Sequence, residues 1–407
     1  MIKVPVGDFK LGEIEKKAIN EVLDSGRISE GFKVREFEEK WGKFIGTHYS
    51  SAMSSGTSAL IAGLTALKNY DDLNIKQGSK VITTPLTYIS TSNAIVLSNF
   101  EPVFIDINKN DFCINPENIE EHLEEIDDPS EYSIILPVHL MGFPCDMDPI
   151  NKIASKYGLV TFEDSAQAHG SLYKGKKTGS LSLISAFSFY IAHNIQAGEL
   201  GAINTNDMEL IRLIRKIKTN GRMCDCRVCL RNQGKCPQLK QSLSQDDFDP
   251  RFAHDIIGYN FKAMEFQAAL AISQLNKVDE IISKRQKNVL YLNENLKEFH
   301  EIIQIPEYNK DISYLAYPIL IKNPEKISRK KIRLELEKRG VETRPLFGSI
   351  PTQQIAYQHL KDQYSGKIPN ADYVGANAFY IGCHQYLEEN ELEYVVRVFN
   401  KILKDFK

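Results

Sequence analysis

Four cysteines stand close together near the middle of the chain. Cys224, Cys226, Cys229 and Cys236 follow the pattern C-x-C-x2-C-x6-C within the stretch NGRMCDCRVCLRNQGKCPQ. They are four of only seven cysteines in 407 residues, so chance clustering is a poor explanation. Four thiolates suit zinc, which would staple the segment, and they equally suit an iron–sulfur cluster. The sequence therefore predicts a metal site here and leaves the metal open.

Two further stretches stand at the boundaries of predicted elements, one at the start of a helix and one at the end of a strand. Gly56 and Thr57, in SSGTS, open a helix whose free N–H groups could bind a phosphate, although a plain helix N-cap uses the same residues. Asp164 closes the apolar run LVTFED. A carboxylate at a strand end can pair with a protonated pyridine nitrogen, and it can also be a surface acid or a helix cap.

The segments around these residues alternate between short apolar runs and helical periodicity. This alternation over ~150 residues predicts an α/β fold with a mostly parallel sheet and helices on both faces. Beyond about residue 300 the pattern changes to a mixed α+β segment. We expect a large domain over 1–299 with a cysteine-bearing insertion near 219–257, and a small domain over 300–407. The predicted strands of the large domain are 80–83, 101–107, 133–137, 159–164 and 200–205, and the predicted helices include 10–26, 33–46, 206–218 and the region 262–299.

The composition excludes several classes of protein. A net charge of -3 gives no indication of a nucleic-acid partner. No stretch approaches the length of apolar sequence that spans a membrane, and the N-terminus lacks the apolar segment of a signal peptide. Seven cysteines without such a signal argue against a disulfide framework. We therefore expect a cytoplasmic protein without a membrane span.

A series of motifs gives the chain a resemblance to a known family. Over residues 54–271 the chain carries, in order, SGTSAL, TPLTYISTSNAI, VHLMG, EDSAQAHGSLYKGKKTGS, AFSFYIAHNIQAGELGA and HDIIGYNFKAMEFQAALA, and VETRP follows near 344. With this array it resembles the DegT/DnrJ/EryC1/StrS family of pyridoxal-phosphate (PLP) sugar enzymes. The resemblance covers nearly the whole chain and implies the aspartate-aminotransferase (type I) fold.

The resemblance also implies which residues would hold the cofactor. Gly56 and Thr57, helped by Ser188, would bind its phosphate group. Asp164 would pair with the ring nitrogen, and Gln167 would contact the ring hydroxyl. Tyr88 would stack on the pyridine ring, with a place in the apolar core as the alternative for this aromatic side chain.

Two other residues have implied roles outside this set. Asn260, in GYNFK, would reach the cofactor phosphate of a partner subunit, which implies a homodimer with shared active sites. Arg344, in VETRP, is similar to an arginine near the family's substrate, and a surface salt bridge is the competing interpretation.

His193 stands where the family's aminotransferases carry the lysine that forms the Schiff base. Histidine cannot form that imine, but a neutral imidazole with an ordinary pKa of about 6.5 can act as a general base. Pyridoxamine phosphate (PMP) would then be held without a covalent bond and would favour loss of the C3 hydroxyl from a nucleotide-linked 4-keto-6-deoxy sugar. The chain in this respect resembles the family's 3-dehydratases; a catalytically silent scaffold is the alternative.

The same resemblance bears on the metal. Some 3-dehydratases of the family combine the histidine with downstream cysteines that hold an iron–sulfur cluster. We therefore favour a [2Fe–2S] cluster at Cys224, Cys226, Cys229 and Cys236, with an electron-donor reductase or a ferredoxin as partner. The alternative is a structural zinc, with hydrolysis of the product and regeneration of PMP from glutamate.

Overall fold

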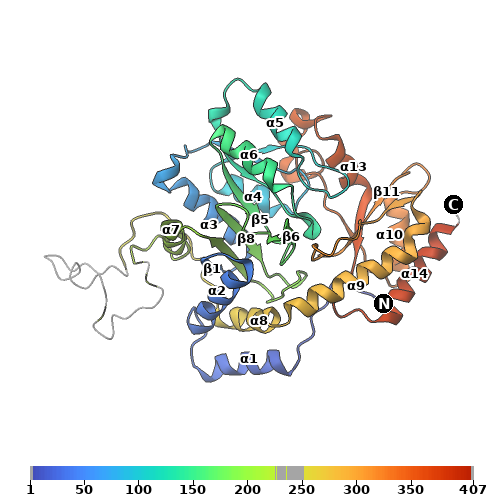
Figure 1. Cartoon of the computed structure of the whole chain (residues 1–407), viewed down its shortest axis with the longest axis horizontal. Coiled ribbons are helices and arrows are strands. Elements are labelled where there is room, and N and C mark those ends of the chain that lie inside the picture. Colours follow the sequence, from blue (N-terminus) through green and yellow to red (C-terminus); the bar gives the residue numbers. More distant parts are fainter. Residues whose placement is uncertain (1–2, 225, 227–234, 236–251, 405–407) are drawn as a thin grey trace.

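The computed structural model describes residues 3–224, 226, 235 and 252–404 (Figure 1). Its α-helices are α1 (Glu13–Asp24), α2 (Phe32–Ile45), α3 (Gly56–Lys68), α4 (Ser90–Leu97), α5 (Pro116–Glu125), α6 (Met147–Tyr157), α7 (Met208–Lys218), α8 (Glu265–Leu275), α9 (Val278–Leu296), α10 (Arg329–Lys338), α11 (Ile350–Gln353), α12 (Lys361–Tyr364), α13 (Pro369–Asn377) and α14 (Glu389–Leu403). Its strands are β1 (Tyr49–Met53), β2 (Lys80–Thr83), β3 (Glu101–Phe104), β4 (Tyr132–Leu136), β5 (Val160–Asp164), β6 (Leu172–Tyr173), β7 (Lys176–Lys177), β8 (Ile184–Ser188), β9 (Gly201–Thr205), β10 (Ile303–Gln304), β11 (Tyr317–Ile321), β12 (Arg344–Pro345) and β13 (Ala378–Ile381).

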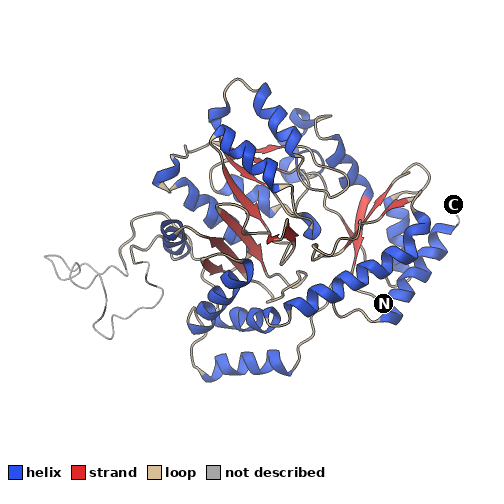
Figure 2. Cartoon of the chain, in the orientation of Figure 1, coloured by secondary structure: helices blue, strands red, loops and turns tan. Residues whose placement is uncertain are grey.

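A seven-stranded sheet in the order β1-β9-β8-β5-β4-β2-β3 forms the centre of the larger part of the molecule (Figure 2). Strand β9 pairs antiparallel with both β1 and β8, while β8, β5, β4, β2 and β3 are all mutually parallel. The predicted α/β class and mostly parallel sheet are confirmed. Because β1, β2, β5 and β8 run in the same direction, their carboxyl ends meet at one edge of the sheet, where ligands bind in folds of this kind.

The strands bury side chains on both faces of this sheet. Ile203 of β9 and Ile184 of β8 belong to the core formed with α3, α4 and α7. Their neighbours Ala202 and Phe187 belong to a second core formed with α2 and α8. Successive strand residues point to opposite faces, so each strand contributes to both cores, which explains why these strands are apolar without clear alternation.

A smaller antiparallel sheet, in the order β10-β11-β13-β12, lies beyond the 19-residue helix α9. The N-terminal residues also pack here, since Val4 pairs with Val341 in a parallel bridge and the N–H of Lys3 donates to the Gly340 carbonyl at 2.8 Å. The chain therefore reaches this sheet from both of its ends. No helix of the described residues is long and apolar enough to cross a membrane.

The structure differs from the expected elements at several places. Strand β3 ends at Phe104 rather than residue 107, and the predicted helical region 262–299 is divided between α8 and α9. Strands β1 and β8 had not been predicted. Both are rich in serine, as YSSAM and ISAFS, which hides the apolar signal of a buried strand.

The beginning of α2 is held by a carboxylate from α8. Oε1 of Glu265 accepts the N–H groups of Gly31 at 2.8 Å and Val34 at 2.9 Å, and Oε2 accepts that of Lys33 at 2.8 Å. Glu265 is buried, and α2 has no side-chain cap of its own. A negative charge at this point also interacts favourably with the helix dipole.

We expect Glu265→Gln to lower the free energy of unfolding by about 1–3 kcal/mol, because buried N–H groups lose a charged acceptor. Urea denaturation followed by circular dichroism measures this change. Glu294→Gln, at an exposed position of α9, serves as control and should change the value by no more than about 0.5 kcal/mol. Equal stability of the two variants would show that the cap contributes nothing.

Candidate active site

The start of α3 forms a cradle of backbone N–H groups against the ends of β8 and β9. A Cβ on Gly56 would lie 2.5 Å from the Cβ of Ser188, and a Cβ on Gly201 would lie 2.0 Å from the Ser55 carbonyl oxygen. Only glycine therefore allows this close approach at both positions. Ser55 caps the helix by accepting the Ser58 N–H at 3.1 Å. The cradle, with Thr57 as its second helical residue, suits the phosphate group of a cofactor.

Asp164 stands at the carboxyl end of β5 and is almost fully buried. Its Oδ2 accepts the Thr91 hydroxyl at 2.8 Å, and its Oδ1 accepts the Ala166 N–H at 3.2 Å. Burial raises the pKa of Asp164, and within the described part of the chain no lysine or arginine pairs with it. A buried carboxylate in this state suits a cationic partner such as a protonated ring nitrogen.

His193 lies in the turn that follows β8. Its Nδ1 lies 2.8 Å from the Ser188 carbonyl oxygen, which can only accept, so Nδ1 carries the proton and Nε2 keeps a free lone pair. Burial lowers the pKa of His193 to about 4, the hydrogen bond to Ser188 opposes that shift, and the charge of Arg285 adds to it. The ring is therefore neutral at physiological pH and can accept a proton at Nε2.

A second histidine lies directly behind this turn. The rings of His169 and His193 are 6.0 Å apart between centroids and nearly perpendicular. His169 Nδ1 accepts the Ile195 N–H at 3.3 Å, and burial lowers the pKa of His169 well below its ordinary value. His169 belongs to the motif EDSAQAHGSLYKGKKTGS, from which no role was predicted for it. It keeps the wall behind His193 uncharged.

The turn is also fixed by contacts with distant segments. Asn194 Nδ2 donates to the Ser313 carbonyl at 2.9 Å, and Gln196 Nε2 donates to the Asp8 carbonyl at 2.9 Å. These two bonds join the turn to the loop before β11 and to the N-terminal segment. Sequence periodicity gives no signal for either contact, because each spans more than a hundred residues of chain.

The other predicted cofactor residues lie in two places. Gln167 is buried, and its Oε1 accepts the Met141 N–H at 2.9 Å. Tyr88 is 58% exposed, and its ring lies 6.0 Å from that of Phe347, which comes from the C-terminal part of the chain. Tyr88 is therefore not a core aromatic, and its ring is available to a ligand.

Asn260 and Arg344 have surroundings of their own. Asn260 is exposed, and its Oδ1 accepts the Lys262 ammonium at 2.5 Å. Arg344 forms an ion pair with Glu342 at 3.1 Å, as the competing interpretation of that residue expected, and it lies opposite Tyr380 on the neighbouring strand.

The cysteine segment is described only in part. Cys224 is half-buried and Cys226 is exposed, whereas Cys229 and Cys236 lie outside the described residues. No group of three or more metal-ligating side chains occurs within residues 3–224, 226, 235 and 252–404. The metal site therefore stays a prediction.

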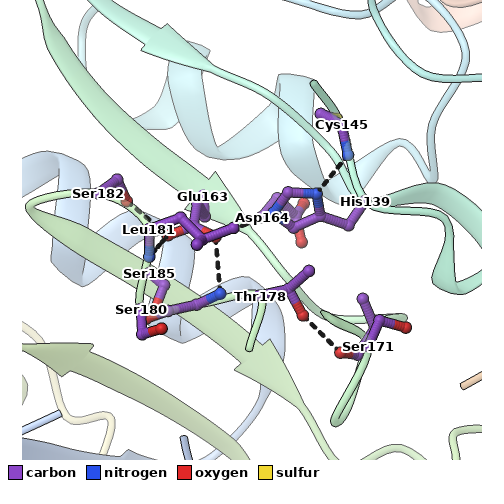
Figure 3. Close-up of polar contacts among 12 residues, drawn as sticks. His139, Cys145, Glu163, Asp164, Ser171, Thr178, Ser180, Leu181, Ser182 and Ser185 are labelled. Atoms are coloured by element: carbon purple, nitrogen blue, oxygen red, sulfur yellow. Dashed lines mark hydrogen bonds and ion pairs between the residues drawn. The ribbon is translucent and has the colours of Figure 1, made fainter. Parts of the chain in front are cut away.

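A buried polar network holds the strand that ends at Asp164 (Figure 3). Oε2 of Glu163 accepts from His139 Nε2 at 3.0 Å and from the Gly179 N–H at 2.6 Å, and Oε1 accepts from the Leu181 N–H at 2.9 Å and the Ser182 hydroxyl at 2.8 Å. His139 Nδ1 in turn accepts the Cys145 N–H at 3.0 Å, so its proton is on Nε2. No role was predicted for Glu163 or His139 from the sequence.

Comparison with known proteins agrees with this arrangement. A model of the DegT/DnrJ/EryC1/StrS aminotransferase family matches residues 10–400. The lipopolysaccharide biosynthesis protein RfbH of Salmonella typhimurium is 31% identical, over 98% of this chain and 91% of its own length. The GDP-4-keto-6-deoxy-D-mannose 3-dehydratase of Escherichia coli O55:H7 is 27% identical, over 98% of this chain and all of its own.

A solved structure is similar over the same range. The E. coli GDP-4-keto-6-deoxy-D-mannose-3-dehydratase with bound hydrated PLP superposes with a TM-score of 0.84 at 27% identity, covering 98% of this chain and 99% of that one. The match of sequence and fold over nearly the full length confirms the predicted family. The chain belongs to the DegT/DnrJ/EryC1/StrS aminotransferase family.

Proposed function

We propose that this protein removes the C3 hydroxyl from a nucleotide-linked 4-keto-6-deoxyhexose, with pyridoxamine phosphate as cofactor and His193 as the base. The observation that carries the proposal is His193 itself, a neutral imidazole with a free Nε2 in the turn after β8. The similarity of the whole chain to relatives described as 3-dehydratases supports the same reaction class.

The residues near the sheet edge suit this cofactor. The N–H groups at Gly56, with the hydroxyls of Thr57 and Ser188, would hold the phosphate. Asp164, buried and without a described cationic partner, would hold the protonated ring nitrogen. When bound, the cofactor supplies an amine that can condense with the 4-keto group and a ring that can store electrons.

The work of the chain itself is proton transfer and placement. His193 would take a proton at Nε2 while Nδ1 stays bonded to the Ser188 carbonyl, which fixes the direction of the ring. The exposed ring of Tyr88 would cover one face of the cofactor. Since histidine cannot form an imine, no covalent bond between the chain and the cofactor competes with the bound amine.

Wild-type protein supplied with PMP, a 4-keto-6-deoxy nucleotide sugar and a one-electron reductant is expected to release a product that lacks the C3 hydroxyl, which mass spectrometry detects. His193→Lys should lower the rate at least ~100-fold, because the positioned neutral base is lost. The same variant should bind PLP covalently, which its absorption spectrum and borohydride trapping detect independently of activity. His300→Asn, at an exposed surface position, should behave as the wild type.

The pH profile gives a second test of the base. Since the active form is the neutral imidazole, kcat/KM should fall as the pH drops through the pKa of about 4, and His193 should not titrate in the profile near pH 6.5. No C3 dehydration by the wild type, with cofactor bound and a one-electron reductant present, would refute the proposed reaction and favour the silent scaffold. A wild-type acid limb near 6.5 would contradict the burial of the ring.

We further propose that Cys224, Cys226, Cys229 and Cys236 bind a [2Fe–2S] cluster, with structural zinc as the alternative. The spacing of four thiols within a single segment supports metal binding, and Cys224 and Cys226 are the described half of this donor set. A cluster would require a reductase or ferredoxin as electron donor; zinc would instead leave PMP to be regenerated from glutamate.

Protein purified without oxygen should contain ~2 iron and ~2 sulfide per chain and absorb broadly in the visible range. Cys224→Ser should lose most of this iron, because a thiolate ligand is removed. Cys383→Ala, which changes a buried cysteine far along the chain, should keep it. One zinc per chain without sulfide would contradict the cluster and support the structural zinc. Metal-free protein would refute both the cluster and the zinc site.

We also propose that the protein is a homodimer in which Asn260 reaches the partner's cofactor phosphate. Exposed apolar side chains stand on the segments that flank this residue. Phe32 begins α2 and Ile28 precedes it, next to Ser29, which pairs with Met264; Ile257 lies three residues before Asn260. Such a patch next to an exposed binding residue is typical of a protein–protein interface.

Phe32→Glu is expected to convert a species of twice the chain's mass into a monomer, because the interface would bury a charge without a partner. Light scattering after size-exclusion chromatography measures the mass. Leu97→Glu introduces the same charge at an exposed position of α4 and should leave the dimer intact. A wild-type monomer at micromolar concentration would refute the proposal.

A further inference from the structure

A pocket of about 620 Å³ lies between the start of α1, the corner between α8 and α9, and the loop that precedes α14. Its wall includes Lys10, Gln274, Lys284, Lys287 and Tyr386. None of the residues assigned above to the cofactor or the substrate lines it. It is therefore a separate concave site whose side chains the proposed reaction does not use.

The acid on the inner wall of this pocket is already neutralised. Glu15 is 1% exposed, and its Oε1 accepts from Lys277 at 2.7 Å and from Gln274 Nε2 at 3.1 Å. Its other oxygen accepts the Gly12 N–H at 3.0 Å, at the N-cap of α1. The Glu15–Lys277 pair thus cancels its own charge and fixes the pocket floor.

Three lysines remain at the pocket without a carboxylate partner in the described part of the chain. Lys284 and Lys287 are one turn apart on α9, and Lys10 lies 5.4 Å from the centroid of the Tyr386 ring. The other acid of the lining is Glu280. The pocket therefore carries an excess of positive charge, and the start of α1 at Gly12 adds the positive end of a helix dipole.

Two enclosed amide groups at the wall also lack partners among the described residues. Gln274 is 1% exposed, and its Oε1 is unpaired although its Nε2 is bound to Glu15. Nε2 of Gln385 is unpaired, while its Oε1 accepts from Arg285 Nε at 3.1 Å. In each amide one of the two polar atoms is hydrogen-bonded, and the other has no partner among the described residues. An unpaired buried polar group costs roughly 1–3 kcal/mol, which a ligand would recover.

We propose that this pocket binds a small phosphate ester. Lys10, Lys284 and Lys287 would surround the phosphate oxygens, and Gln385 Nε2 would donate to one of them. The Tyr386 ring would cover the organic part of the ligand. The excess positive charge, the fixed amide of Gln385 and the aromatic wall together suit this class of anion.

The test uses full-length protein loaded with PLP, so that the cofactor phosphate site is filled. Isothermal titration with a hexose monophosphate is expected to show saturable binding of one equivalent per chain, weakened at least tenfold in Lys284→Ala/Lys287→Ala. Lys401→Ala/Lys404→Ala removes two exposed lysines elsewhere and should bind as the wild type. Gln385→Leu, which keeps the charge of the pocket, should also weaken binding by several fold.

Inorganic phosphate, titrated in parallel, separates the two sources of the anion. Tighter binding of the ester, with the difference lost in Tyr386→Ala, supports an organic phosphate. Equal affinities for the two ligands would overturn the assignment of an ester. No saturable binding, or binding that the Lys284/Lys287 pair does not alter while the control pair behaves as wild type, would overturn the site altogether.

Discussion

The side chain of Glu163 is entirely enclosed, and in the described part of the chain its carboxylate accepts hydrogen bonds from donors of other segments. His139 reaches it from the loop after β4, and the residues from Gly179 to Ser182 reach it from the turn before β8. Because neighbouring strand residues point to opposite faces, the bonds to Glu163 also hold Asp164, which points the other way. Removing one donor from a buried acceptor of this kind typically costs about 1–3 kcal/mol, and more where the acceptor is charged.

Hydrogen bonds from distant segments also fix the position of His193. Its turn is bonded to the N-terminal segment through Gln196 and to the loop before β11 through Asn194. That loop is held in turn by Arg285 of α9, whose guanidinium donates to the carbonyls of Tyr314 and Leu315. The turn that carries the candidate base is therefore held by the N-terminal segment and by the loop before β11. Its geometry depends on how the smaller sheet packs against the larger one.

Two of the candidate residues could be placed from local patterns alone. Gly56 opens a predicted helix and Asp164 ends a predicted strand, so turn chemistry and the sheet-edge rule pointed to both. His193 follows β8, which was not predicted, and only the resemblance to the family singled it out. The His139–Glu163 bond and the Glu265 cap could not be predicted, because they join residues 24 and more than 230 positions apart. Serine-rich β1 and β8 were missed for a different reason, since burial between two helical layers tolerates small polar residues that periodicity scores as loop.

Trp41 is the only tryptophan of the chain, and it is completely buried on α2. Its ring lies 5.4 Å from that of His169, which forms the wall behind His193. Indole emission overlaps the absorption of a vitamin B6 ring, and a charged imidazole quenches it. The protein thus contains its own optical reporter. A single indole lies against His169, which in turn contacts the candidate base, so indole fluorescence can follow loading of the site and protonation of His169 without any label.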